Sequence, residues 1–140
     1  MNYILDTNVI SEVVSARPNP EVIGWTDSVD TERVFLSVIA IGELKKGIEK
    51  LADSNRKLKL IEWLHDDLLV RFENQLLPID QETMLVWGSL VARLEAVGHP
   101  ISAIDSLLAA TALRFQYTLV TRNVAHFEHT GAILLNPWAK

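Results

Sequence analysis

The chain has 140 residues, with 13 Lys and Arg against 18 Asp and Glu, so its net charge at pH 7 is −5. Its length fits one domain with an ordinary hydrophobic core, and a hydrophobic content of 49% excludes an intrinsically disordered protein. The lack of Cys excludes disulfides, thiolate zinc sites and cysteine nucleophiles, and the acidic balance excludes a protein that binds nucleic acid by broad electrostatic attraction alone.

Short apolar runs along the chain predict strands that are buried on both faces. These runs are residues 3–5, 34–36, 118–120 and 132–135. Between them, apolar side chains recur with helical spacing, in stripes over residues 41–51, 60–68 and 87–94. This alternation is typical of an α/β domain, which we expect to span residues 1–140, with a projecting helical hairpin over residues 51–76.

Asp6 is the first candidate site residue. It follows the strand predicted over residues 3–5 and directly precedes Thr7 and Asn8, at the start of a helix. Open α/β sheets bind ligands beyond the carboxyl ends of their strands, so an acid at this point is in a suitable place for a site. An ordinary helix N-cap explains Asp6 equally well.

Glu43 is the second candidate. It lies at the edge of the apolar stripe of the next helix, which begins after the natural cap residue Ser37. No cation stands four residues later, where Gly47 is found, although an ordinary boundary glutamate would often have such a partner. The small neighbours Ala40 and Gly47 leave room for a ligand or a metal ion.

Asp105 is the only charged residue in the segment 101–113, whose apolar and small side chains predict a helix that is buried nearly all round. A buried carboxylate is costly unless it is paired, hydrogen-bonded or bound to a metal. The spacing of Ser102 and Asp105 also fits a capping box, so a structural cap remains open beside a functional acid.

The turn after the strand at residues 118–120 carries the polar side chains Thr121, Arg122 and Asn123, which suit a phosphate or water contact as well as a plain turn. One sheet can bring this turn and the three acids to its carboxyl edge. Hard oxygen ligands without Cys favour Mg²⁺ or Mn²⁺ over zinc. Such an ion offsets repulsion among the acids and promotes hydrolysis of a phosphodiester.

Several motifs occur in a characteristic order from end to end of the chain: Leu5-Asp6-Thr7-Asn8, Glu43, Ile104-Asp105-Ser106-Leu107-Leu108, Leu119-Val120-Thr121-Arg122-Asn123 and Asn136-Pro137-Trp138. Together they resemble the PIN-domain family, specifically its VapC and FitB toxins. The resemblance implies a three-layer α/β/α fold with a central parallel sheet of four to five strands. It also implies a Mg²⁺-dependent endoribonuclease that is the toxin of a type II toxin–antitoxin pair.

The resemblance further implies roles and partners. Asp6, Glu43 and Asp105 match the family's metal-binding acids, for Mg²⁺ or Mn²⁺, and Asn123 stands where many members carry a fourth acid. The residues expected to position water or the RNA phosphate are Thr7, Asn8, Ser37, Thr121 and Arg122. The implied partners are RNA, an antitoxin laid across the cleft, and a second copy in a homodimer or a heteromeric complex with the antitoxin. No apolar run has the length of a membrane span, so we expect a cytoplasmic protein.

Two other functions remain open. One is a catalytically weak PIN-fold binding module that acts on DNA through a protein partner, which the acidic charge and Asn123 favour. The other is phosphoryl transfer through an aspartyl nucleophile at Asp6, which fits less well because Asn8 stands two residues later and no Gly-rich phosphate loop occurs.

Other polar and aromatic residues are less informative. Six basic residues gather between 45 and 59 and form either a solvated helix face or an RNA contact: Lys45, Lys46, Lys50, Arg56, Lys57 and Lys59. His126 and His129 have metal-ligand spacing but no third ligand nearby. The four Trp residues, at 25, 63, 87 and 138, are expected to be core or interface anchors.

Overall fold

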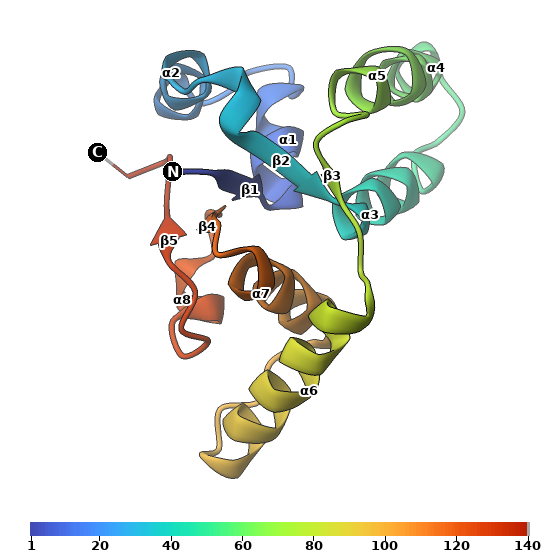
Figure 1. The fold of residues 1–140 in the computed structure, drawn as a ribbon. Helices are drawn as coiled ribbons and strands as arrows, with labels where there is room; N and C mark the ends of the chain where they lie inside the picture. Colours follow the sequence, from blue (N-terminus) through green and yellow to red (C-terminus); the bar gives the residue numbers. More distant parts are fainter. Residues whose placement is uncertain (140) are drawn as a thin grey trace.

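A computed structural model describes residues 1–139 of the chain. Its centre is a parallel sheet with the strand order β3-β2-β1-β4-β5 (Figure 1). The strands are β1 (Tyr3–Leu5), β2 (Val34–Ser37), β3 (Leu76–Leu77), β4 (Thr118–Val120) and β5 (Leu134–Leu135). The four runs predicted as strands are confirmed, and β3 is an additional strand beside β2.

Helices cover both faces of the sheet, which confirms the three-layer α/β/α fold. On one side lie α1 (Thr7–Val13), α2 (Pro20–Ser28), α3 (Val38–Glu49), α4 (Asn55–Glu62) and α5 (Leu69–Arg71), with the 3₁₀ helix η1 (Thr31–Arg33) and the π-helical turn η2 (Trp63–Leu68). On the other side lie α6 (Gln81–Ala96), α7 (Ala103–Phe115) and α8 (Val124–Phe127) (Figure 1).

Alternating residues of the central strands supply two hydrophobic cores. Ile4 and Leu119 pack against α6 and α7, whereas Leu5 and Val120 pack against α1, α2 and α3. Successive side chains of a strand point to opposite faces, so a strand that is covered on both sides must be apolar throughout. This requirement explains why these strands read as continuous apolar runs in the sequence.

The region of residues 51–76 differs from the prediction. It holds one continuous helical segment, Asn55 to Arg71, in which α4, η2 and α5 follow one another, and this segment packs back on α3 (Figure 1). The predicted hairpin within this range is therefore wrong. Leu64, Leu68 and Phe72, each four residues apart, keep one face of the segment buried in the core, so no reversal is needed to bury them.

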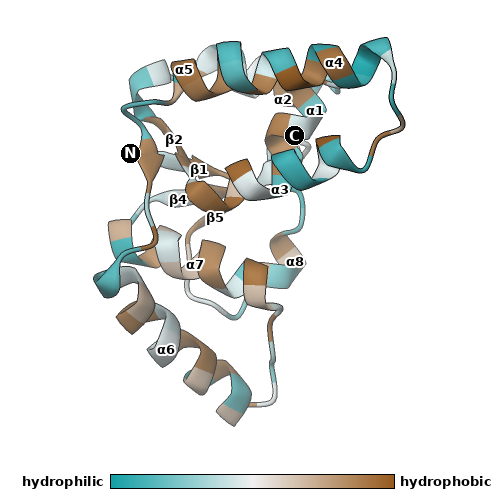
Figure 2. Ribbon diagram, turned by 90° about the vertical axis from the view of Figure 1, so that its right-hand side faces the viewer, coloured by the Kyte–Doolittle hydropathy of each residue, from teal (hydrophilic) through white to brown (hydrophobic). Residues whose placement is uncertain are grey.

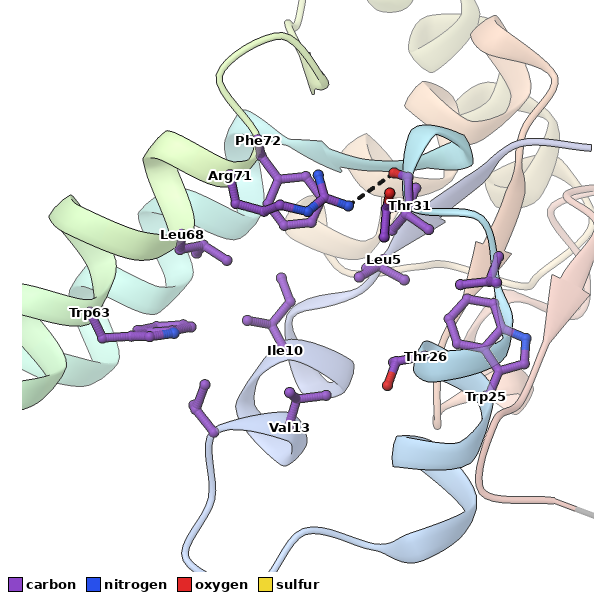
Figure 3. Close-up of a pocket in the computed structure, with 13 residues that line it drawn as sticks. Leu5, Ile10, Val13, Trp25, Thr26, Thr31, Trp63, Leu68, Arg71 and Phe72 are labelled. Carbon is purple, nitrogen blue, oxygen red and sulfur yellow. Dashed lines mark hydrogen bonds between the residues drawn. The ribbon is translucent and has the colours of Figure 1, made fainter.

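An apolar cavity of about 260 Å³ lies between α1, α2 and the segment of η2 and α5 (Figure 3). Arg71 closes part of its rim by donating a 2.9 Å hydrogen bond to the Thr31 carbonyl. None of the three candidate acids lines this cavity, so the polar site must lie elsewhere. Among residues 1–139, no helix is both long enough and apolar enough to cross a membrane.

Candidate active site

The carboxyl ends of β1 and β4 open into a cleft of about 450 Å³. The residues that line it are Asp6, Thr7, Asn8, Ser11, Glu12, Glu43, Asp105, Arg122, Asn123 and Trp138. The structure therefore brings together all three predicted acids with Asn123, although Asp6 and Asp105 are far apart in sequence. This convergence follows from the parallel sheet, which places the ends of β1 and β4 side by side.

Asp6 forms the floor of the cleft, with only 8% of its surface exposed. Its Oδ1 accepts a 2.7 Å hydrogen bond from the Thr7 amide, which makes it the N-cap of α1. Its Oδ2 accepts a 2.8 Å hydrogen bond from the Thr121 hydroxyl and a 3.3 Å hydrogen bond from Asn8 Nδ2. Asp6 is thus a helix cap and a cleft residue at once.

The environment of Asp6 disfavours its charged form. Burial raises the pKa of this carboxyl, although hydrogen bonds from Thr121 and Thr7 oppose the shift. The negative charges of Glu43 and Asp105 raise the pKa further. A cation in the cleft would offset this repulsion, so the electrostatics suit a metal site.

Glu43 reaches the cleft from α3. Its Oε1 accepts a 2.6 Å hydrogen bond from the Thr7 hydroxyl, which ties α3 to the start of α1. No neighbour fills the space beside Gly47, one helical turn later, because a Cβ built there meets no atom within 4 Å. The space beside Gly47 is therefore open, and Glu43 as a metal or water ligand stays a prediction.

Asp105 enters the cleft from the first turn of α7. Its amide donates a 3.3 Å hydrogen bond to Ser102 Oγ, so Ser102 is the N-cap. Within the described chain, its carboxylate is not hydrogen-bonded to Ser102 in return, and Asp105 Oδ2 lies 3.4 Å from His126 Nδ1. The reciprocal capping box is therefore absent from residues 1–139, and Asp105 lines the cleft while its carboxylate lies beside His126.

The expectation of a helix buried all round is wrong at this end of α7. The Asp105 side chain is 28% exposed, and Ile104 is 44% exposed. Ser106 is already buried, and every residue from Leu108 to Ala112 is buried. The apolar composition could not reveal this difference, because the first turn of α7 projects past the layer that covers its middle.

The turn after β4 supports Asp6 from behind. Thr121 is fully buried, and its hydroxyl accepts a 3.0 Å hydrogen bond from the Asn123 amide while it donates to Asp6. The Arg122 guanidinium lies over the Trp138 ring, 5.5 Å from its centroid. Asn123 lines the cleft, and its side chain makes no cap hydrogen bond to α8. Thr121 is therefore a support for Asp6, while Arg122 and Asn123 face the cleft.

Sequence reasoning included two residues that do not line the cleft, Ser37 and the supporting Thr121, and missed others that do. Ser37 is fully buried and caps α3 by accepting a 3.1 Å hydrogen bond from the Ile39 amide. Glu12 lines the cleft, and it could have been found because it follows Asn8 by four residues on one helix. Trp138 was expected to be only an anchor, yet it forms part of the cleft wall.

The donor set of the cleft fits Mg²⁺ or Mn²⁺ in type and charge, because it offers carboxylate oxygens and the amide oxygen of Asn123. In the positions described for residues 1–139, no three acidic or imidazole side chains close on one point that would hold an ion. Glu43 is fixed by the Thr7 hydroxyl, whereas the partly exposed Asp105 side chain has room to turn toward Asp6. The site fits a metal ion by its chemistry.

Comparison with known proteins agrees with this geometry. The family described as PIN domain matches residues 3–132, which is most of the chain. The chain belongs to the PIN-domain family. The match includes Asp6, Glu43, Asp105 and Asn123, so the whole acidic cleft falls inside the PIN domain apart from Trp138.

Named relatives place this PIN domain in the VapC and FitB group. Toxin FitB of Neisseria gonorrhoeae is 35% identical over 96% of this chain and 97% of its own length. VapC ribonuclease Y4jK of Sinorhizobium fredii is 32% identical over 96% of each chain. A solved structure of FitAB bound to an IR36 DNA fragment contains a chain that is 33% identical, with a TM-score of 0.94 over 99% of this chain and 96% of that one.

Proposed function

We propose that this PIN domain is a Mg²⁺-dependent endoribonuclease and the toxin of a toxin–antitoxin pair. The observation that carries the proposal is the convergence of Asp6, Glu43 and Asp105 on one cleft. Three carboxylates in one cleft repel one another without a cation, and this repulsion adds to the rise in the pKa of Asp6 that burial mainly causes. A relative of similar length, VapC ribonuclease Y4jK, carries the ribonuclease activity in its name.

The residues of the cleft divide into ligands and supports. Asp6 and Asp105 would hold the ion, and Glu43 would hold it or orient the attacking water. Mg²⁺, or Mn²⁺ in its place, supplies a lowered water pKa and neutralises charge that develops on the phosphoryl oxygens. Thr7 fixes the Glu43 carboxylate and Thr121 fixes the Asp6 carboxylate by the hydrogen bonds described above.

The turn residues would act on the RNA itself. The Arg122 guanidinium faces the cleft and can donate two parallel hydrogen bonds to a phosphate. Asn123 offers an amide oxygen where a fourth acid would add charge, so it can orient a water molecule without increasing the repulsion. Asn8 already accepts from the Arg122 amide at 3.4 Å and so holds the turn against α1.

We further propose that the chain forms a complex with an antitoxin, assembles as a homodimer or in that heteromeric complex, and acts in the cytoplasm. The support is the close structural match to FitB in the complex with FitA and DNA. Because that complex contains DNA, it also favours a second candidate function, a weak nuclease whose main role is to bind DNA through its protein partner. The two functions differ in one respect, since only the nuclease needs the three acids.

A direct assay separates these functions. Purified protein would be incubated with a mixed RNA pool in Mg²⁺, in Mn²⁺ and in EDTA, beside the variants Asp6→Asn and Asp105→Asn. The nuclease predicts cleavage with either ion and a loss of at least about 100-fold in EDTA or in either variant. Equal RNA loss under all conditions would show a contaminant or a different mechanism, and no cleavage by the wild type would favour the binding module.

A further inference from the structure

The basic residues between 45 and 59 divide into two sets in the structure. Lys45 is paired with Glu49 at 2.6 Å on the exposed side of α3. Lys57 donates to the carbonyls of Glu49 and Leu51, at 3.2 and 3.1 Å, and so caps the end of α3. Lys45 and Lys57 therefore have structural partners, as expected for cations on a solvated helix face.

Lys46 and Lys50 differ from them in position and in pairing. Both line a cavity of about 580 Å³ between α3 and α7, and Glu43 lines the same cavity. Glu43, Lys46 and Lys50 follow the spacing of a single helix face. In the described part of the chain, neither Lys ammonium has an ion pair or a side-chain hydrogen bond.

The wall opposite the two lysines is apolar. Ile79, Ile104 and Leu107 line it, and Ile104 is largely exposed. Gly42 and Gly47 leave the α3 side open, since a Cβ at either position meets no atom within 4 Å. In Figure 2, α3 carries both hydrophilic (teal) and hydrophobic (brown) turns, and α7 carries several hydrophobic (brown) turns. The cavity is thus a groove whose α3 side carries the two free cations beside the apolar Val38 and Ile39, and whose opposite side is apolar.

We propose that this groove, lined by Lys46 and Lys50, binds the backbone of the RNA strand next to the bond that is cleaved. The inference rests on the proposed function and extends it, because it names where the substrate runs beyond the acids. Unpaired cations recognise phosphates by charge, and the apolar side can contact bases or sugars without sequence preference. Glu43 belongs to both the cleft and the groove, so a strand in the groove leads directly to the acids.

The charge of the groove favours RNA over a protein as its occupant. Lys residues are depleted in the buried centres of protein interfaces, and an ammonium without a partner would be left desolvated there. A polyanion instead supplies partners for both cations and releases counterions. The groove also explains how a chain with a net charge of −5 can approach RNA at all.

The test compares two double variants with the same loss of charge. In Lys46→Ala/Lys50→Ala the groove cations are removed, whereas in Lys45→Ala/Lys59→Ala two other cations of the same run are removed, neither of which lines the groove. Binding of a fluorescent single-stranded RNA is measured by anisotropy in EDTA over a range of salt concentrations. Single-strand contacts contribute about 0.7 each to the slope of log K against log salt, so the groove variant should lower the slope by about 1.4.

Cleavage in Mg²⁺ gives a second readout. The groove variant should raise KM with little change in kcat, because the acids are untouched. Gly47→Glu offers a variant that adds a negative charge at a position where a Cβ meets no atom within 4 Å, and it should weaken RNA binding as well. The matched control should behave as the wild type in both assays.

The possible results separate the inference from the proposed function. Equal salt slopes for the two double variants would overturn the inference, even if the wild type cleaves RNA. A changed oligomeric state of the groove variant in sedimentation, with an unchanged slope, would overturn it in favour of a protein interface. If the wild type does not cleave RNA but the groove variant still shows a lower salt slope than the wild type, the result would support RNA binding in the groove and contradict the nuclease function.

Discussion

The Thr7 hydroxyl donates a 2.6 Å hydrogen bond to Glu43 Oε1, across 36 residues of sequence. This contact joins the first residue of α1 to the middle of α3, and it holds one acid of the cleft beside another. A partly exposed glutamate would otherwise sample several rotamers. Thr7 is therefore a positioning residue for Glu43.

Replacing Thr7 tests this role. Thr7→Val keeps the shape of the side chain and removes the donor, and we expect a loss of about 10–100-fold in Mg²⁺-dependent RNA cleavage, with a weaker apparent Mg²⁺ affinity. Thr7→Ser keeps the hydroxyl and should retain most activity. Rates of Thr7→Val that match those of the wild type would show that the hydrogen bond does not position Glu43.

The stability of the metal-free protein should depend on Asp6 and pH. Burial raises the pKa of Asp6 above its ordinary value of 3.8, so the folded state holds this proton more tightly than the unfolded state. The resulting stabilisation is fully present below the unfolded pKa and is lost as pH rises through the folded pKa. The variant Asp6→Asn has no carboxyl to titrate at this position. In EDTA, the difference obtained by subtracting the Tm of the wild type from the Tm of this variant should therefore increase as pH rises from about 4 to about 7.

Thermal melts at several pH values measure this difference, and Thr121→Val serves as a variant that alters the same hydrogen bond while the carboxyl stays. A Tm difference that does not change with pH would contradict the account of Asp6. Mg²⁺ should raise the Tm of the wild type and should not raise that of Asp6→Asn. At an Mg²⁺ concentration of 100 times Kd, the free energy of unfolding of the wild type should increase by about 2.7 kcal/mol.

Asn123→Asp should strengthen metal binding. The substitution adds a carboxylate to a cleft that already holds Asp6, Glu43 and Asp105, and the number of charged ligands tunes affinity for a hard cation. We expect half-maximal cleavage at a lower Mg²⁺ concentration, together with a lower Tm in EDTA because repulsion increases. Asn123→Ala is the control, and an Mg²⁺ requirement that is the same for Asp and Asn at this position would refute the prediction.

The end of α7 provides a prediction about the fold alone. Gln116 adopts a left-handed conformation, with φ of 60°, and its amide donates back to the Leu113 carbonyl. A left-handed backbone conformation costs a non-glycine residue about 1–2 kcal/mol. A glycine avoids this cost, but its greater freedom in the unfolded chain offsets part of the benefit. Gln116→Gly should therefore raise the free energy of unfolding by about 0.5–1 kcal/mol in urea titration, and a decrease would contradict the assigned cap.

The sequence allowed the central strands and the acids of the cleft to be predicted for one physical reason. Strands covered on both faces must be apolar throughout, so Ile4 and Leu119 lie in recognisable runs, and an acid that follows such a run is conspicuous. Asp6 was predictable on this basis, and Asp105 by the related rule that a lone charge in the apolar segment 101–113 is conspicuous. The match of the chain to a known motif order then supplied the fold class as a whole.

Other features depended on contacts that local sequence does not encode. Strand β3 has only two residues, and it exists because Leu77 pairs beside Ser37. Trp138 lies near the end of the chain and joins the cleft wall only because the chain after β5 returns to the turn that holds Arg122. Lys46 and Lys45 are adjacent in sequence, yet one lines a groove and the other forms a salt bridge, because they lie on different faces of α3.

The chemical nature of the cut ends tests the central claim most directly. If the acids of the cleft promote attack of water on the phosphorus, a single turnover in ¹⁸O-labelled water should place one ¹⁸O in the terminal phosphate of the product, with no 2′,3′-cyclic phosphate. An RNA with a 2′-deoxy nucleotide at the cleaved position should still be cut by the wild type in Mg²⁺, and it should remain intact with Asp105→Asn. A cyclic phosphate product, or protection of the RNA by the 2′-deoxy substitution, would contradict hydrolysis by the acidic cleft.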